Sequence, residues 1–546
     1  MWLQDYDPLH FWPLSTLAAA LPLCTFFFVL LRLKLRVWKA ALSGMLAAIL
    51  MALVVFRMPP LLIGVSALLG ILIGWLRIAW ILVASIFLYN VTLATGQFEV
   101  MKESFARLTR DRRVQVILVT LCVGPFLEGT GSAGAPIAMV GVLLVGLGFQ
   151  PLQAAKVCLL TNTVPLAWGG IGSPLKVLAA GSGLSESQLS VMLGRALPVV
   201  TAVLPLWLLC AMMGWRKARQ VLPIALASGL SYAAMQFCWS NLGGAKTVDI
   251  AAAAFSFLAT IAVLKIRPPQ PSGANGSGAT ADWPYTGYDA SRRLSPMSIA
   301  RAWSPFILAS ACVFILGIPA LRAALTFSFL AQPAPFLNNA VMRVPPAAPG
   351  LTPEPAIADL NIFVMYGTAL FIGATLSGVL LGRSVKDTFR IFRQTVSRLV
   401  PALLGVSLMI GFLFVQRYSG MITIMGLLLT RTGPAFPFFS AFIGWIGVSL
   451  TGADVASSSL FSHVQSAVAA QKGLSPVLMA AAQAGGSVIG KMVDPQSILV
   501  SATATRQGGK EGEIFKTVFK HSLLLTCILG LVVLIYAYLL PRVVPH

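Results

Sequence analysis

Apolar segments long enough to cross a lipid bilayer recur along almost the whole chain. A membrane-spanning helix needs about 20 apolar residues to cross roughly 30 Å of hydrocarbon, and such segments run from 14–31 to 521–540. Only 10% of the 546 residues are charged, whereas a soluble domain carries about a quarter charged residues. The sequence therefore predicts an all-α polytopic membrane protein with about 12–14 transmembrane helices. The ranges 60–75 and 78–95 are two of the apolar segments, and short segments could be re-entrant.

Basic residues gather in short clusters between the apolar segments. A net charge of +22 could indicate a nucleic-acid partner, but the clustering favours a different explanation. Loops rich in Lys and Arg stay in the cytoplasm, so we expect this location for the clusters at 32–39, 102–113, 216–219, 383–398 and 510–520. The N-terminus then lies outside the cytoplasm, membrane lipid surrounds the chain, and no nucleic-acid partner is expected.

The cysteines and histidines do not form a recognisable metal or disulfide pattern. The seven cysteines include no Cys-x-x-Cys pair, and the four histidines are scattered. Neither arrangement is typical of a metal site. We therefore expect no metal and no cofactor.

A polar stretch at 266–300 separates two apolar halves, 1–265 and 301–546, and each half contains a similar motif series. The first repeat covers about 128–174 and includes TGSAGAP and TNTVPLAWGGIGSP; the second covers about 451–497 and includes TGADVASSS and AQAGGSVIGKMVDP. Two related halves with broken or re-entrant helices at the midplane are typical of secondary transporters. The sequence leaves open whether the repeat is inverted.

Glycine and small polar residues interrupt the apolar pattern at four places within these repeats. A broken helix in hydrocarbon is tolerated only around a buried or watery cavity, and the freed N–H groups would suit a carboxylate. The alternative is close helix packing through small residues. The candidate substrate-binding residues are Gly129, Gly131, Ser132, Gly134, Asn162, Thr163, Thr451, Gly452, Ser457, Ser458, Lys491 and Gln496.

Ionisable residues flank the same glycine breaks. Charge within a membrane is costly and usually functional, so Lys491 could pair with a substrate carboxylate. Glu128, Asp454 and Asp494 are the candidates for carrying a coupled proton, with Glu128 preferred. The alternative for each is a structural ion pair. The chain contains no phosphate-binding P-loop motif, so we expect an ion gradient to supply the energy.

Several long motifs occur in an order that resembles the bacterial lactate permease family. They include FLEG (126–129), LLVGLGFQPL (143–152), RAWSPF (301–306), LTGADVASS (450–458) and GKM-x-x-PQSI (490–498). The resemblance implies a proton-coupled carrier in the bacterial cytoplasmic membrane that imports L-lactate or a related 2-hydroxy monocarboxylate.

The chain departs from the family pattern inside the expected site. It has Ser132 and Ala133 where members tend to have Gly-Phe, 483–485 reads Gln-Ala-Gly in place of Asn-Thr-Thr, and Asp494 replaces Ser. These differences motivate an alternative, a carrier for another small organic anion such as glycolate or a sulfonated acid. A membrane-embedded enzyme, which would need a nucleophile–base pair or a metal cluster, is a remote alternative, and we expect no enzymatic activity.

Overall fold

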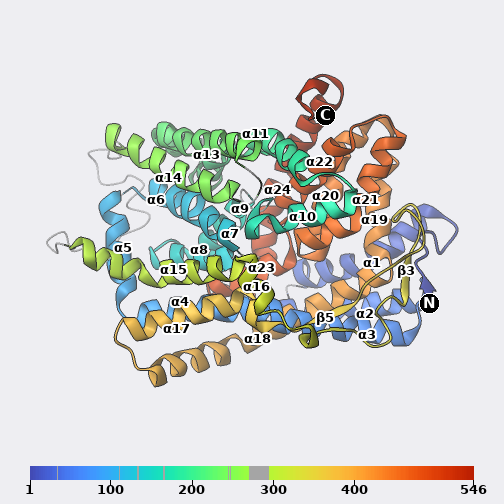
Figure 1. Cartoon of the computed structure of the whole chain (residues 1–546), viewed down its shortest axis with the longest axis horizontal. Helices are drawn as coiled ribbons and strands as arrows, with labels where there is room; N and C mark the ends of the chain where they lie inside the picture. Colours follow the sequence, from blue (N-terminus) through green and yellow to red (C-terminus); the bar gives the residue numbers. More distant parts are fainter. Residues whose placement is uncertain are drawn as a thin grey trace.

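The computed structural model describes residues 1–33, 35–109, 111–131, 135–163, 167–243, 245, 247–269 and 294–545. Two predicted site residues, Ser132 and Gly134, lie outside the described residues, as do Ala133 and most of the stretch 266–300. The described chain is built almost entirely of helices (Figure 1). The predicted fold class, an all-α polytopic membrane protein, is confirmed.

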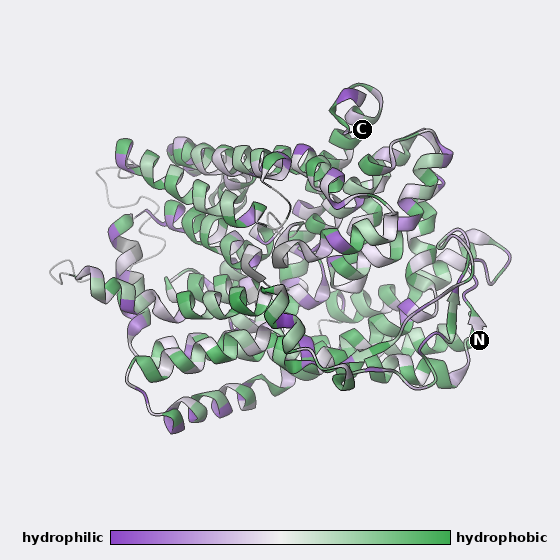
Figure 2. Cartoon of the chain, viewed as in Figure 1, coloured by the Kyte–Doolittle hydropathy of each residue, from purple (hydrophilic) through white to green (hydrophobic). Residues whose placement is uncertain are grey.

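Among the described residues, ten helices are long and apolar enough to cross a membrane. Hydrophobic residues cover most of their length (Figure 2). They are α1 (Trp12–Leu31), α2 (Val37–Val54), the continuous helix Pro60–Ala94, α11 (Glu186–Met213), the helix Trp215–Leu242, α14 (Val248–Ile266), α15 (Pro296–Gly317), α18 (Val385–Tyr418), the helix Gly433–Thr451 and α24 (Glu511–Tyr538).

The apolar segments 60–75 and 78–95 belong to one continuous helix. The two segments form one rod of α3 (Pro60–Ile73), the π-helical turn η1 (Gly74–Ala79) and α4 (Trp80–Ala94). No proline lies between the segments to end the helix. The rod packs along α18, and a Cβ atom on Gly74 would lie only 2.9 Å from the Ser407 Cα atom. Close contact with the α18 backbone at Gly74 thus supports the π-helical turn between α3 and α4.

Helices broken near their middle lie between these long helices. In the first half, α6 (Arg112–Ile117), η2 (Leu118–Val123) and α7 (Gly124–Gly131) lead to α8 (Ala135–Gly146), followed by α9 (Pro151–Thr161) and α10 (Gly169–Ser182). In the second half, α20 (Phe436–Thr451) leads to α21 (Asp454–Gln471), followed by α22 (Pro476–Gly490) and α23 (Pro495–Ala504). Each half thus contains a helical hairpin followed by an interrupted helix.

The two hairpins enter the molecule from opposite ends. Arg112, at the start of α6, donates a hydrogen bond to the Leu147 carbonyl just after α8, so both arms of the first hairpin begin and end together. Lys472, just after α21, lies 5.9 Å from the ring centre of Phe436 at the start of α20. Tyr538, at the C-terminal end of α24, donates to the carbonyl of Pro434, just before α20, so it lies beside the open end of the second hairpin. The motif series therefore runs in opposite directions in the two halves, while the boundaries at 265 and 301 stay a prediction.

Three of the basic clusters meet at one end of the molecule. Arg383 donates to the Ala94 carbonyl, and Arg113 donates to the Lys217 carbonyl at 3.1 Å. The loops at 102–113, 216–219 and 383–398 are thus brought to a common face, as the predicted orientation requires.

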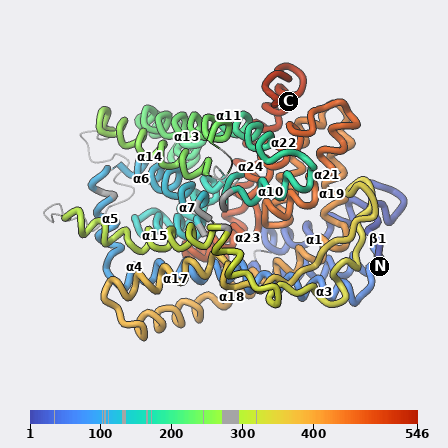
Figure 3. Tube along the Cα trace, viewed as in Figure 1, coloured from blue at the N-terminus to red at the C-terminus, as the bar shows by residue number. Residues whose placement is uncertain are grey.

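An extended segment between α16 (Pro319–Ala324) and α17 (Tyr366–Leu380) reaches across to the N-terminus (Figure 3). It carries β2 (Ala331–Pro333), β3 (Val341–Arg343), β4 (Thr352–Pro353) and β5 (Ile357–Asp359). Strand β3 pairs in parallel with β1 (Trp2–Leu3) and antiparallel with β4, while β2 pairs with β5. This segment covers the end of α18 that is remote from Arg383.

Candidate functional site

Two helix breaks meet around Gly452 and Lys491. Gly452, between α20 and α21, has a φ of +70°, a left-handed conformation that favours glycine. Lys491 follows α22, and its ammonium group donates to the Gly452 carbonyl and lies 2.9 Å from the Asp494 Oδ2 atom. The Lys491 side chain is 5% exposed and that of Asp494 is 0% exposed. The fold thus brings Gly452, Lys491 and Asp494 into contact, while their role in substrate binding stays a prediction.

Asp494 also forms the N-terminal cap of α23. Its oxygens accept hydrogen bonds from the backbone N–H groups of Gln496 (2.8 Å) and Ser497 (3.1 Å) and from the Ser497 hydroxyl (2.6 Å). Pro495 follows at the first helical position, where its missing N–H group costs nothing. Together with Lys491, four donors surround this carboxylate. These contacts give Asp494 a structural role as the cap of α23 and the partner of Lys491.

Asp454 has the opposite environment. It is 5% exposed at the start of α21, and neither of its carboxylate oxygens has a hydrogen-bond partner among the described residues. The hydroxyls of Ser458 and Ser462, one and two turns further along the same helix, are also buried without partners. Buried polar groups are normally paired. An unsatisfied row of this kind indicates that α21 faces a water molecule or a polar ligand.

The other candidates in the second half help to shape this break. Thr451 donates to the Gly447 carbonyl at 2.7 Å, and Ser457 lies 3.1 Å from the Ser487 hydroxyl of α22. The Gln496 side chain covers Gly452, because a Cβ atom added to Gly452 would lie 2.7 Å from the Gln496 Oε1 atom. Thr451 is thus bonded within α20, Ser457 is bonded to α22, and Gln496 borders the break.

In the first half, Glu128 is completely buried near the end of α7. Its Oε1 atom would lie 3.4 Å from a Cβ atom on Gly169, which begins α10. Gly129 packs against α14, and Gly131 is the last residue of α7. The structure therefore places Glu128 between the hairpin and the second arm of the interrupted helix.

Asn162 and Thr163 follow α9 at the first-half break. Asn162 is 6% exposed, and its Nδ2 atom has no hydrogen-bond partner in the described part of the chain. The Thr163 hydroxyl donates to the Leu160 carbonyl at 2.9 Å. Asn162 thus retains a free donor, whereas Thr163 caps its own helix.

The two halves interlock through their broken helices. Helix α10 packs on α21, where a Cβ atom on Gly181 would collide with the Ser462 hydroxyl. Reciprocally, α23 packs on α8 and α9, and Cys158 lies 3.3 Å from the Ser501 hydroxyl. Lys491 itself bonds to Gly452 and Asp494, not to Glu128. The predicted residues therefore form two neighbouring clusters, one in each half.

A cavity of about 470 Å³ lies at the end of the molecule where the basic loops meet. Leu499 and Thr503 of α23 form part of its wall, and its lining includes Arg36, Arg398 and Arg506. The lining contains these three guanidinium groups and one carboxyl group, Glu511, so its net positive charge attracts anions. The two wall residues of α23 lie about one and a half and two and a half turns of that helix away from the Asp494 break.

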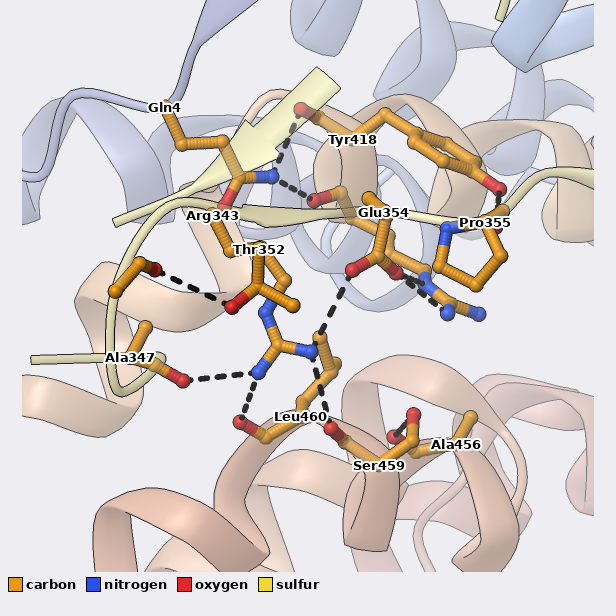
Figure 4. A network of polar contacts seen from close by, with 12 residues as sticks. Gln4, Arg343, Ala347, Thr352, Glu354, Pro355, Tyr418, Ala456, Ser459 and Leu460 are labelled. Carbon is orange, nitrogen blue, oxygen red and sulfur yellow. Dashed lines mark hydrogen bonds and ion pairs between the residues drawn. The ribbon is translucent and has the colours of Figure 1, made fainter. Parts of the chain in front are cut away.

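A polar network ties the extended segment to the second half (Figure 4). The buried Glu354 carboxylate accepts hydrogen bonds from Arg417 at 2.9 and 2.6 Å and forms an ion pair with Arg343 at 3.5 Å. Arg343 also donates to the Ser459 and Leu460 carbonyls of α21. Beside the network, burial raises the pKa of the Tyr6 hydroxyl above its ordinary value. The network fixes the segment to the helix that carries Asp454.

The sequence analysis missed two buried polar residues that the structure brings to these clusters, Asp249 and Ser462. Asp249 stands next to Gly129, although it is 120 residues away in sequence. An acidic residue at the start of the apolar segment 247–264 was the available signal. The spacing of four residues between Asp454, Ser458 and Ser462 was the signal for the second.

Among the described residues, no group of three or more His, Cys, Asp or Glu side chains could hold a metal ion. The two clusters offer one ammonium group, four buried carboxyl groups and several hydroxyl and amide groups. These groups can bind a small anion and hold a proton.

The chain is similar to known proteins along almost its whole length. The sequence matches the family described as L-lactate permease over residues 15–540. The chain is 36% identical to the L-lactate permease of Escherichia coli strain K12, with 100% of both chains covered. It is 37% identical to the glycolate permease GlcA of the same strain, with 98% of each covered. The solved YdaH transporter of Alcanivorax borkumensis is 18% identical, covers 86% of both chains and gives a TM-score of 0.31, too low to support an argument. The full-length matches establish that this multi-pass membrane protein belongs to the L-lactate permease family.

Proposed function

We propose that the protein imports L-lactate or a related 2-hydroxy monocarboxylate together with a proton across the bacterial cytoplasmic membrane. The observation that carries the proposal is the Lys491 ammonium group, which is buried where two helix breaks meet. An ammonium group has three donors, and two of them are directed at Gly452 and Asp494. The third is available for the carboxylate of a substrate.

The substrate carboxylate would bind at Lys491, and buried polar groups without partners among the described residues would supply further hydrogen bonds. Ser458 offers a buried hydroxyl without a partner, and Asn162 offers a buried amide donor. A 2-hydroxy acid presents a carboxylate and a hydroxyl group on adjacent carbon atoms, so it can use an ammonium group and a neutral polar group together. The arginine-lined cavity would favour the passage of the anion on the side of the basic loops.

The coupled proton would reside on a buried carboxyl group. Glu128 remains the preferred carrier because it is completely buried at the end of the first hairpin. Asp454 is the competitor, since both of its oxygens are buried and without partners in the described structure. Asp494 is the weakest candidate because four donors already stabilise its charged form.

A carrier for glycolate is the second candidate function. The relative named glycolate permease is as similar to this chain as the relatives named L-lactate permease. Glycolate lacks only the methyl group of lactate, so one pocket could accept both acids. A single methyl group is worth only about 1–3 kcal/mol of discrimination.

Uptake by the purified protein in liposomes tests the proposal. We expect an inward proton gradient to drive accumulation of labelled L-lactate or glycolate, and expect propionate, which lacks the 2-hydroxyl group, to compete poorly. Glu128→Gln should abolish accumulation driven by the gradient and retain part of the exchange of lactate for lactate. Gradient-driven accumulation at the normal rate by Glu128→Gln would shift the assignment to Asp454. Failure of every hydroxy acid to accumulate would refute the proposed function.

A further inference from the structure

Asp249 is a buried acidic residue to which the proposed function gives no role so far. It is the second residue of α14 and is 1% exposed. The Tyr232 hydroxyl of α13 (Leu222–Leu242) donates to its Oδ1 atom at 3.3 Å. Its Oδ2 atom has no hydrogen-bond partner in the described part of the chain. A carboxyl group held by one neutral donor is poorly stabilised in its charged form.

Asp249 lies beside the turn of α7 that carries Glu128. A Cβ atom added to Gly129, the residue after Glu128, would lie 3.0 Å from the Asp249 Cβ atom and 3.1 Å from the Ile250 backbone nitrogen. Glycine at this position therefore allows the two helices to touch. Because Glu128 directly precedes Gly129, Glu128 and Asp249 lie on facing turns of α7 and α14.

The helices that pack on α14 around Asp249 supply few other titratable groups. They are α13, α7 and η2, and the groups near Asp249 are Tyr232 and Glu128, with Cys122 of η2 beside Tyr232. These three elements contain no Lys, Arg or His, and the basic residue of α14, Lys265, lies 16 positions further along the helix. Two neighbouring carboxyl groups in such a place resist being ionised at the same time.

We propose that Asp249 is a second proton-binding carboxyl group and that it shares a proton with Glu128, so that the two titrate as a coupled pair. The inference rests on the proposed function in that this proton is the one transported. A proton that arrives from one side forms an O–H bond on either carboxylate, and that bond breaks when the proton leaves to the other side. No further reactant is needed.

The pair offers a way to link the proton to the anion. Uptake of the proton removes one negative charge next to the first hairpin, and this change favours the binding of a carboxylate nearby. By thermodynamic linkage, the bound anion favours protonation to the same extent. Asp249 would thus set the pH range in which the carrier loads.

Infrared titration of the purified protein without substrate tests the pairing directly, because a protonated carboxyl group has its own C=O stretching band. In Asp249→Asn, one such band should disappear, and the midpoint of the remaining Glu128 titration should move to lower pH by about one unit or more, since the like charge is gone. In Tyr232→Phe, the loss of the hydroxyl donor should move the pair's titration to higher pH. Glu103→Gln, which neutralises a buried acid of α5 (Gln97–Leu108), serves as the charge-matched control and should move neither midpoint.

If Asp249 has only a structural role, Asp249→Asn should melt at a lower temperature while the midpoint of the Glu128 titration stays unchanged. This result would overturn the inference. If Asp249→Asn does not fold, the titration of Tyr232→Phe is the deciding measurement. An unchanged titration in that variant would also overturn the inference. The titration tests the pair and the uptake assay tests the carrier, so the two can fail separately. A coupled titration in a protein that fails to accumulate any acid would keep the pair and refute the proton-driven carrier.

Discussion

Replacing Lys491 with methionine separates the structural role of this residue from its role in substrate binding. Methionine keeps a long unbranched side chain but removes the charge that pairs with the buried Asp494 at 2.9 Å. Breaking a buried ion pair by removing one partner costs about 3–5 kcal/mol. Asp494 keeps its three bonds from Gln496 and Ser497. We therefore expect Lys491→Met to lower the free energy of unfolding by an amount near the lower limit, about 3 kcal/mol.

The double variant Lys491→Met/Asp494→Asn restores charge balance. Asparagine still caps the start of α23, so most of the lost stability should return. Transport should not return, because the substrate carboxylate has lost its ammonium partner. A hydrogen bond to a charged group contributes about 1.5–3 kcal/mol, so the apparent affinity for lactate should fall roughly 10- to 150-fold.

The assay combines thermal unfolding of the purified proteins with lactate exchange in liposomes at equal protein content. Asp494→Asn alone is the control for the cap, since it leaves the ammonium group in place. Exchange by the double variant with the wild-type KM would refute the reasoning. Lys491 would then only neutralise Asp494.

Three further outcomes follow from the structure. Gly452→Ala should destabilise the fold by about 1–2 kcal/mol because its backbone is left-handed, and should also weaken lactate binding because the new Cβ atom meets Gln496. Gly473→Ala, at a φ of +64° and with open space around it, should show only the destabilisation. Glu354→Gln should lower the free energy of unfolding by about 3 kcal/mol, and with it the melting temperature. The KM of the folded protein should stay unchanged, because the partners of Glu354 lie in the network of Figure 4. Cysteines replacing the exposed Leu108 and Val385 should react with an impermeant thiol reagent only after the membrane is opened, whereas one replacing Leu351 should react from outside; the reverse pattern would overturn the orientation.

Much of the architecture could be predicted because membrane helices leave a local signal. Apolar segments of spanning length identify the helices, since every backbone group in hydrocarbon must be bonded within its own segment. Gly452 and Pro495 mark two of the breaks for equally local reasons, a left-handed φ and a missing N–H group. The resemblance in motif order then indicated the family that the full-length comparison established.

The partners of the charged residues could not be predicted in the same way. The sequence suggested that Lys491 binds a substrate and that Asp494 carries a proton. In the fold, the two residues form an ion pair with each other across one turn of chain. Asp249 reaches Glu128 only because α14 packs against Gly129. The cost of a buried charge depends on which groups surround it in space, and those groups come from distant segments.

The sequence by itself determined the class of protein, most of its helices and the positions of its breaks, because hydropathy and backbone conformation depend on neighbouring residues. Only the tertiary structure decided that 60–94 is one continuous helix, that the two hairpins enter from opposite ends, and which polar groups remain without partners. These features depend on contacts between residues that are far apart in the chain, and such contacts leave no periodic pattern in the sequence.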